Sequence, residues 1–321
     1  MSSLQNLILQ TLLYYDIFDH PLTVVEILKF LPANTVSLSD IQVALAEMIL
    51  EGKVEQSQGF YSLAGKTTGL SKQRLQKQQY ARKLWMVARV VTHVLKRFPF
   101  VRAVIISGDL SKNVADKNSD IDFFVITENR RLWICRGMLT LFKKVFLLNS
   151  KKFFCINYYV SVEHMEVQER NIYTATEIAH LQPTYNEDLF YKFEEANSWV
   201  RDFFPNFRLQ RNGHHRRNGN SSLLRSVLEI PFRGRWADRL DTRLMVFMKE
   251  VWKERYPLLS EEQRDKMFRC RPYESRAHGG NFEEKVLTAY AERLRSCGIS
   301  QIEIDSSGGL RSVDVVEESQ G

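Results

Sequence analysis

The segment "VRAVIISGDLSKNVADKNSDIDFFVIT", residues 101–127, contains two apolar runs separated by a polar loop. The first run, 101–106, is rich in β-branched residues and ends at Ser107-Gly108, which is typical of a buried strand that enters a tight turn. The second run, 121–126, repeats the pattern. We therefore predict two buried strands, the second of which begins at or near Asp120.

Two aspartates, Asp120 and Asp122, flank Ile121 at the start of the second predicted strand. Because side chains alternate along a strand, both carboxylates lie on one face, where they repel each other unless a cation or a proton lies between them. Carboxylate, water and phosphate oxygens are the ligands that Mg²⁺ prefers. The pair therefore indicates a metal site, although one aspartate could instead cap a turn while the other lies at the sheet rim.

The turn at Gly108, the loop and the Asp120-Ile121-Asp122 triplet together resemble the signature of the nucleotidyltransferase superfamily of the DNA polymerase beta type. The stretch "SDIDFFVIT" is its most specific part, and the resemblance covers residues 80–165. It implies a mixed sheet with helices on one side and an active site at the turn. It also implies Mg²⁺-dependent transfer of a nucleoside monophosphate from a nucleoside triphosphate to a hydroxyl or amine acceptor, with release of pyrophosphate.

The same resemblance implies roles for individual residues. Asp120 and Asp122 would be the catalytic ligands of two Mg²⁺ ions, which activate the attacking hydroxyl and neutralise the leaving group. Backbone N–H groups and small hydroxyls at the turn would cradle the phosphates. The residues expected in that cradle are Ser107, Gly108 and Ser111, and Asn157 is expected at the third metal-ligand position.

Besides the mild change of a later loop glycine to Asn113, which tolerates the left-handed conformation better than most residues, two positions depart from the family pattern. Asp109 replaces the serine of the turn and places an anion where a triphosphate would bind. Asn157 replaces an acid, and its amide can ligate Mg²⁺ but cannot act as a general base, which leaves that role to Asp122, Glu163 or Glu177. Both departures favour an alternative, in which the chain is a catalytically degenerate member of the superfamily that acts as a binding or regulatory module.

Residues 1–65 predict three helices, with capping boxes at Thr23–Glu26 and Ser39–Gln42, followed by a hairpin near residues 57–59. This order resembles a winged helix. The segment carries seven acidic side chains and two lysines, a net charge of −5, and its presumed recognition helix, "SDIQVALAEMILEG", has no Arg or Lys to contact phosphates. We therefore favour contact with a protein partner, or a spacer role, over DNA binding.

The predicted domain organisation follows changes in charge and pattern along the chain. Residues 66–97 contain nine Lys and Arg and no acid, which predicts a basic helix that is either simply solvated or guides an anionic substrate. The arginine-rich loop at 269–280 either receives a phosphate or is a plain connection. The predicted divisions are a winged-helix-like module (1–65), the basic helix (66–97), the nucleotidyltransferase core (98–165), appended helices (166–207), a basic linker (208–222), a helical region (223–305) and a disordered tail (306–321).

Composition sets the remaining expectations. The 321 residues are 44% hydrophobic and carry a net charge of +7, which suits an ordinary folded protein. No secretory signal or membrane-spanning run is present, so we predict a cytoplasmic protein without a membrane partner. Cys135, Cys155, Cys270 and Cys297 lack CxxC spacing, which favours reduced, core-filling thiols over a zinc site. The predicted fold class is α/β (α+β), in which a mixed-sheet core is flanked by a winged helix and a C-terminal helical domain.

Overall fold

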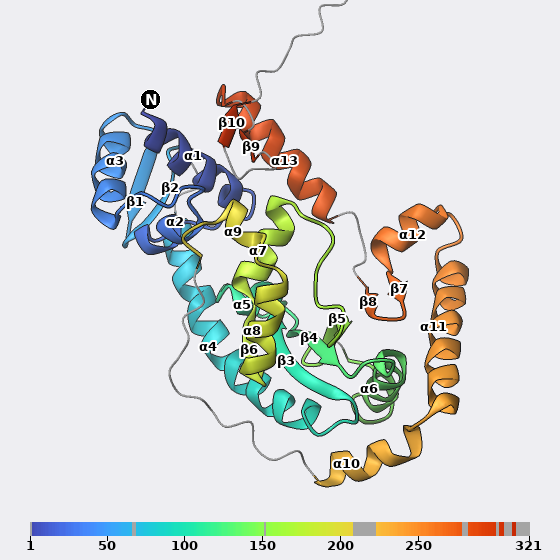
Figure 1. The fold of residues 1–321 in the computed structure, drawn as a ribbon. Helices are drawn as coiled ribbons and strands as arrows, with labels where there is room; N and C mark the ends of the chain where they lie inside the picture. Colours follow the sequence, from blue (N-terminus) through green and yellow to red (C-terminus); the bar gives the residue numbers. More distant parts are fainter. Residues whose placement is uncertain are drawn as a thin grey trace, which may run out of the picture.

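The computed structural model describes residues 2–65, 69–150, 152–207, 223–277, 282–299, 302–304 and 310–312. The protein is a mixed α/β structure built on a six-stranded sheet of order β6-β3-β4-β5-β8-β7 (Figure 1). In this sheet β4 and β5 run parallel and the other neighbours are antiparallel. Its strands are β3 (Val101–Ser107), β4 (Asp122–Thr127), β5 (Cys155–Ser161), β6 (Gln182–Tyr185), β7 (Cys270–Arg271) and β8 (Glu274–Arg276).

The two sequence runs that predicted strands form β3 and β4, which pair directly with each other. Alternate residues of β4 enter two cores: Phe124 and Ile126 pack on one face of the sheet, and Phe123 and Val125 on the other. Both faces are therefore covered, and the expected one-sided cover of helices is wrong. One face packs against α4 (Leu70–Leu95), α6 (Leu132–Phe146) and α11 (Arg235–Arg255), and the other against α7 (Ile172–His180), α8 (Glu187–Ala196) and α9 (Val200–Phe203).

Three helices and a hairpin form the N-terminal region, as the sequence predicts: α1 (Ser3–Asp16), α2 (Val24–Phe30), α3 (Leu38–Leu50), β1 (Val54–Ser57) and β2 (Phe60–Leu63). The capping box at Thr23 and Glu26 is confirmed. The box predicted at Ser39–Gln42 is wrong, because Ser37 caps α3 and Asp40 returns the hydrogen bond. The carboxylate of Asp40 reaches the Ser37 N–H at 2.9 Å, so aspartate serves where the usual pattern expects Glu or Gln.

The N-terminal region shares a hydrophobic core with the sheet and is therefore no spacer. Leu12 and Phe30 belong to the same buried cluster as Ile105 of β3. Helix α13 (Phe282–Ser296), from the other end of the described chain, packs beside α1 (Figure 1). There Tyr290 meets Tyr14 edge to face at 5.3 Å between ring centroids, and Arg293 pairs with Asp16 at 3.1 Å.

The later part of the chain contributes strands that the sequence pattern did not predict. Residues 182–185 form β6, although Pro183 indicated a break; β6 is an edge strand, where proline is tolerated. The region 223–305, predicted to be helical, contains β7 and β8, which extend the central sheet. Its helices are α10 (Leu223–Glu229), α11, α12 (Glu261–Met267) and α13, with a 3-10 turn at Ile230–Phe232.

The last predicted segments lie almost entirely outside the described residues. This holds for the linker at 208–222 and, apart from residues 310–312, for the tail at 306–321. Residues 310–312 form β10 (Leu310–Ser312), which pairs with β9 (Ile302–Ile304). Within the described part of the chain, no helix combines the length and apolar character needed to cross a membrane.

The cysteines fall into two groups. Cys135, Cys155 and Cys270 are buried, as expected for core-filling thiols. Cys297 is exposed, so the core-filling prediction is wrong for it. It follows directly after α13, which ends at Ser296.

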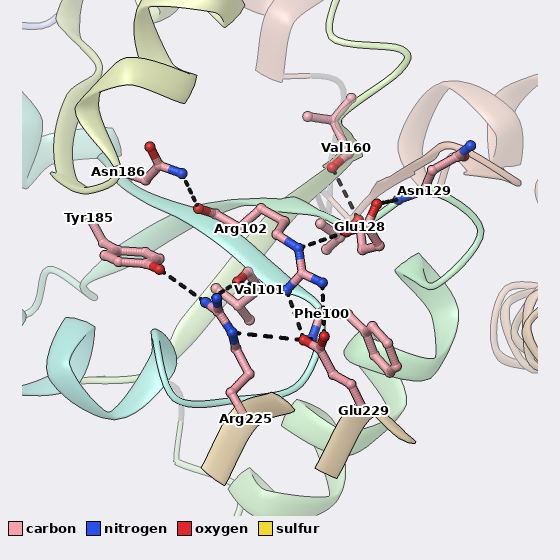
Figure 2. Close-up of polar contacts among 11 residues, drawn as sticks. Phe100, Val101, Arg102, Glu128, Asn129, Val160, Tyr185, Asn186, Arg225 and Glu229 are labelled. Carbon is pink, nitrogen blue, oxygen red and sulfur yellow. Dashed lines mark hydrogen bonds and ion pairs between the residues drawn. The ribbon is translucent and has the colours of Figure 1, made fainter. Parts of the chain in front are cut away.

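An ion-pair network fastens α10 to the start of β3 (Figure 2). Glu229 accepts two hydrogen bonds from Arg102, at 2.8 and 3.0 Å, and one from the backbone N–H of Phe100 at 2.7 Å. Arg102 also donates to Glu128 at 2.8 Å, and Arg225 lies 3.9 Å from Glu229. Burial alone would raise the pKa of Glu229, but these donors hold that pKa below its ordinary value.

We expect Glu229→Gln to lower the free energy of unfolding by about 1.5–3 kcal/mol, because a charge-assisted pair becomes a neutral one. Since the folded-state pKa of Glu229 is lowered, its stabilisation is present above the ordinary carboxyl pKa and is lost as the pH falls through the folded-state value. Urea titrations at pH 7 and at pH 3 measure the effect. A difference between wild type and variant that did not shrink at pH 3 would contradict this assignment.

Candidate functional site

Gly108 follows the last residue of β3 and opens the one-turn helix α5 (Gly108–Ser111). Its φ of 64° lies in the left-handed region, and a Cβ at this position would clash with the Oδ2 atom of Asp122. Ser107 pairs with Asp122 across the two strands, and its hydroxyl donates to the Asp122 carbonyl at 3.4 Å. Two features therefore favour glycine at position 108: the left-handed backbone conformation of the turn and the Asp122 carboxylate packed against it.

We expect Gly108→Ala to lower the free energy of unfolding by about 1–3 kcal/mol, from left-handed strain and displacement of Asp122. Gly52→Ala is the matched control, because Gly52 has a φ of 67° and nothing within 4 Å of the added Cβ. Urea unfolding of both variants separates strain from clash. Equal losses would show that Asp122 does not restrict position 108.

The two aspartates lie at the beginning of β4, which starts at Asp122 rather than at Asp120. Ile121 between them is fully buried, whereas both aspartates remain partly exposed. Burial, followed by the charges of Asp120 and Asp109, raises the pKa of Asp122 to about 6. Three carboxylates thus act on one another, and a bound cation would relieve their repulsion.

Asn157 lies on β5 beside Asp122, next to a register shift that follows Ile156. Its Nδ2 donates to Asp122 Oδ1 at 2.5 Å, and its Oδ1 accepts from the thiol of Cys155 at 3.1 Å. Asn157, which was expected at the third metal-ligand position, thus lies next to Asp122. However, the amide supports the Asp122 carboxylate with a donor and turns its own oxygen toward Cys155, which differs from the expected role of a metal ligand.

These residues line a cavity of about 310 Å³. Ser107, Gly108 and Asp122 form one side of it together with Asp109, whereas Asp120 is not among its lining residues. Helix α7 and Phe282 face them with aromatic and polar side chains, of which Tyr173, Thr174 and Glu177 are examples. Ser111 is buried, and its hydroxyl donates to the Gly108 carbonyl at 2.8 Å, so it holds the turn together rather than facing the cavity.

The acids that were alternatives for the general base differ in position. Glu177 lines the cavity, but it forms an ion pair with Lys112 at 2.5 Å. Glu163 accepts a hydrogen bond from Asn129 and is not a lining residue of the cavity. Asp122 is therefore the best placed of the three.

Sequence reasoning missed the contribution of β8. Arg276 lines the cavity, pairs with Glu283 at 3.0 Å and has a buried Nε without a hydrogen-bond partner in the described structure. It belongs to the arginine-rich loop that the sequence singled out, but nothing in the sequence reveals that this loop joins the sheet next to β5.

Asp120 and Asp122 are the residues that would hold Mg²⁺. Burial, followed by the charges of Asp120 and Asp109, raises the pKa of Asp122, a bound cation would relieve the repulsion between these acids, and water or phosphate oxygens would complete the shell. Within the described ranges, no group of three or more His, Cys, Asp or Glu side chains is arranged to hold a metal ion. A cation here would therefore take the rest of its ligands from water or from a substrate.

Comparison with models of protein families, with curated proteins and with solved structures gave no match. The assignment of a function therefore depends on the geometry of this cavity.

Proposed function

We propose that the protein is a Mg²⁺-dependent nucleotidyltransferase of the DNA polymerase beta type, which transfers a nucleoside monophosphate to a hydroxyl or amine acceptor. The observation that carries this proposal is the contact between the Gly108 turn and the Asp122 carboxylate inside one cavity. A phosphate-binding turn and a metal-binding carboxylate have to lie side by side for this chemistry, since the metal must reach the phosphate oxygens.

The rest of the cavity suits a nucleotide. Its volume of about 310 Å³ lies within the ordinary range of small-molecule sites. Tyr173 and Phe282, with ring centroids 6.0 Å apart, offer apolar faces to a base. The Nε of Arg276, which has no hydrogen-bond partner among the described residues, offers a donor to a phosphate. Bound Mg²⁺ would neutralise charge on the phosphates and lower the pKa of the acceptor hydroxyl.

A second candidate is the catalytically degenerate binding module. Asp109 adds an exposed carboxylate to the cavity wall, and Asn157 occupies the position at which the family has an acid. Asp109 weakens the electrostatic case for a triphosphate, and Asn157 removes an acid that could ligate metal or act as a base, whereas Asp120 and Asp122 are retained. This candidate predicts nucleotide binding without release of pyrophosphate.

Thermal unfolding with excess Mg²⁺ and each nucleoside triphosphate tests the proposal, combined with an assay for pyrophosphate. A ligand at a hundredfold excess over its Kd stabilises the fold by about 2.7 kcal/mol, which raises the Tm by several degrees. We expect such a shift with at least one nucleotide, its loss with EDTA, and pyrophosphate release when an acceptor is supplied. A shift without release under any acceptor supports the binding module, and no shift with any nucleotide refutes both candidates.

A further inference from the structure

A second cavity, of about 200 Å³, adjoins the candidate site. Asp109, Lys112 and Glu177 line both cavities, so the Lys112–Glu177 ion pair lies at their boundary. The far wall comes from the N-terminal region and from the first turns of α4. A molecule bound in this second cavity would therefore lie next to Asp122 and would be enclosed by a part of the chain that the nucleotidyltransferase signature does not include.

The wall formed by α1 and α4 carries hydrogen-bond donors that have no acceptor. The Tyr15 hydroxyl and Arg74 Nε are buried and lack a partner in the described structure, whereas the other nitrogens of Arg74 bind Glu26 and the carbonyl of Pro21. Lys77 forms no ion pair or hydrogen bond with any described residue, although it lines the same cavity. Buried donors are normally satisfied, so this wall is suited to a group rich in acceptor oxygens.

The opposite wall carries acceptors. Asp109 accepts from the Ser119 hydroxyl at 2.9 Å, and Asp116 accepts from the backbone N–H of Asn118 at 2.7 Å. Asp109 is also close enough to Asp122 to raise its pKa. Asp19, which is exposed, lines the cavity from the N-terminal side. Donors on α1 and α4 therefore line the same cavity as the Asp109 carboxylate, which lies beside the candidate metal site.

We propose that the second cavity is the acceptor subsite and that the acceptor carries a phosphate group, which binds Lys77, Tyr15 and Arg74. This inference rests on the proposed function. The hydroxyl or amine of the acceptor then lies at Asp109 beside Asp122 and attacks the α-phosphorus of the nucleotide. The new P–O or P–N bond forms, the bond to pyrophosphate breaks, and the proton passes to Asp109. An aspartate at position 109 thereby gains a role at the turn where a serine was expected.

Inorganic phosphate is the probe for this subsite, in the full chain without Mg²⁺ or nucleotide. Thermal unfolding is compared in phosphate and in sodium chloride of equal ionic strength, because phosphate also stabilises folded proteins non-specifically. We expect phosphate to raise the Tm by a few degrees in the wild type and in Lys77→Arg, and to leave Lys77→Ala unchanged. Lys72→Ala, an exposed lysine on the same helix, is the matched control and should respond like the wild type.

Several outcomes overturn the inference. An equal rise in the Tm of Lys77→Ala would show that phosphate binds elsewhere. No rise in the Tm of the wild type would show that the cavity does not bind phosphate. An equal rise with acetate would exclude a phosphate-specific site. Because neither Mg²⁺ nor nucleotide is present, and because Asp122→Asn should keep the phosphate response, the result is independent of whether the protein transfers nucleotides.

Discussion

Asp122→Asn is expected to lower Mg²⁺-dependent release of pyrophosphate by about a thousandfold or more, because metal-assisted charge neutralisation is worth several kcal/mol in the transition state. The fold should remain, since the asparagine Oδ1 can still accept the hydrogen bond that Asn157 Nδ2 donates at 2.5 Å. Removal of one of three mutually repelling carboxylates should leave the Tm unchanged or raise it. Steady-state assays and thermal unfolding of the same preparation measure the two effects.

Asp202→Asn is the control for this substitution, because Asp202 is exposed on α9. It should match the wild type in rate and in Tm. If Asp122→Asn kept its turnover, Asp122 would not hold a catalytic metal and the proposed chemistry would be wrong. If its Tm fell sharply, the carboxylate would instead be a structural element of the Gly108 turn.

Arg269→Met is expected to produce the largest loss of stability, about 3–5 kcal/mol, because it leaves buried carboxylates without a cation. The Arg269 side chain is 7% exposed and pairs with Glu274, which is equally buried, at 3.2 Å and with Glu169. Tyr158 of β5 donates to the same Glu274 at 2.8 Å. The cluster therefore joins β8 to the strand that carries Asn157, and urea unfolding at neutral pH measures its contribution.

Arg271→Met provides the neighbouring control. Arg271 pairs with Asp265 at 3.1 Å, but both side chains are more than a third exposed, so we expect a loss of about 0–1 kcal/mol. The double variant Arg269→Met/Glu274→Gln should be more stable than Arg269→Met alone, because it removes the more deeply buried of the two carboxylates left without a cation. Equal losses for Arg269→Met and Arg271→Met would show that burial does not determine the value of these ion pairs.

Local patterns in the sequence were sufficient to predict the two strands at the centre of the fold. β-branched runs and a glycine turn predicted β3 and β4. The alternation argument for Asp120 and Asp122 did not hold, because β4 begins at Asp122 and, of the two aspartates, Asp122 alone lines the cavity. The position of Asn157 followed from the resemblance, and the structure places it against Asp122. These features depend on residues close in sequence, or on neighbouring strands with strong apolar patterns.

Long-range pairing accounts for what the sequence did not reveal. β6, β7 and β8 have two to four residues each, too few to show a period, and they become strands because a neighbouring strand offers unpaired N–H and C=O groups. The pairing of Lys112 with Glu177 and the arrival of Arg276 at the cavity depend on the same tertiary contacts. The role of Ser111 was mistaken because its hydroxyl satisfies the backbone of its own turn.

The contact between α1 and α13 links local unfolding of the C-terminal helix to the N-terminal region. Helices from opposite ends of the described chain meet through Tyr14 and Tyr290, and through Asp16 and Arg293, so neither can detach without exposing the other's apolar surface. Tyr15, which neighbours both contact residues of α1, also lines the second cavity. Fraying of α13 would therefore loosen a wall of that cavity, and protease cleavage near α13 should begin to affect ligand binding well before the sheet itself unfolds.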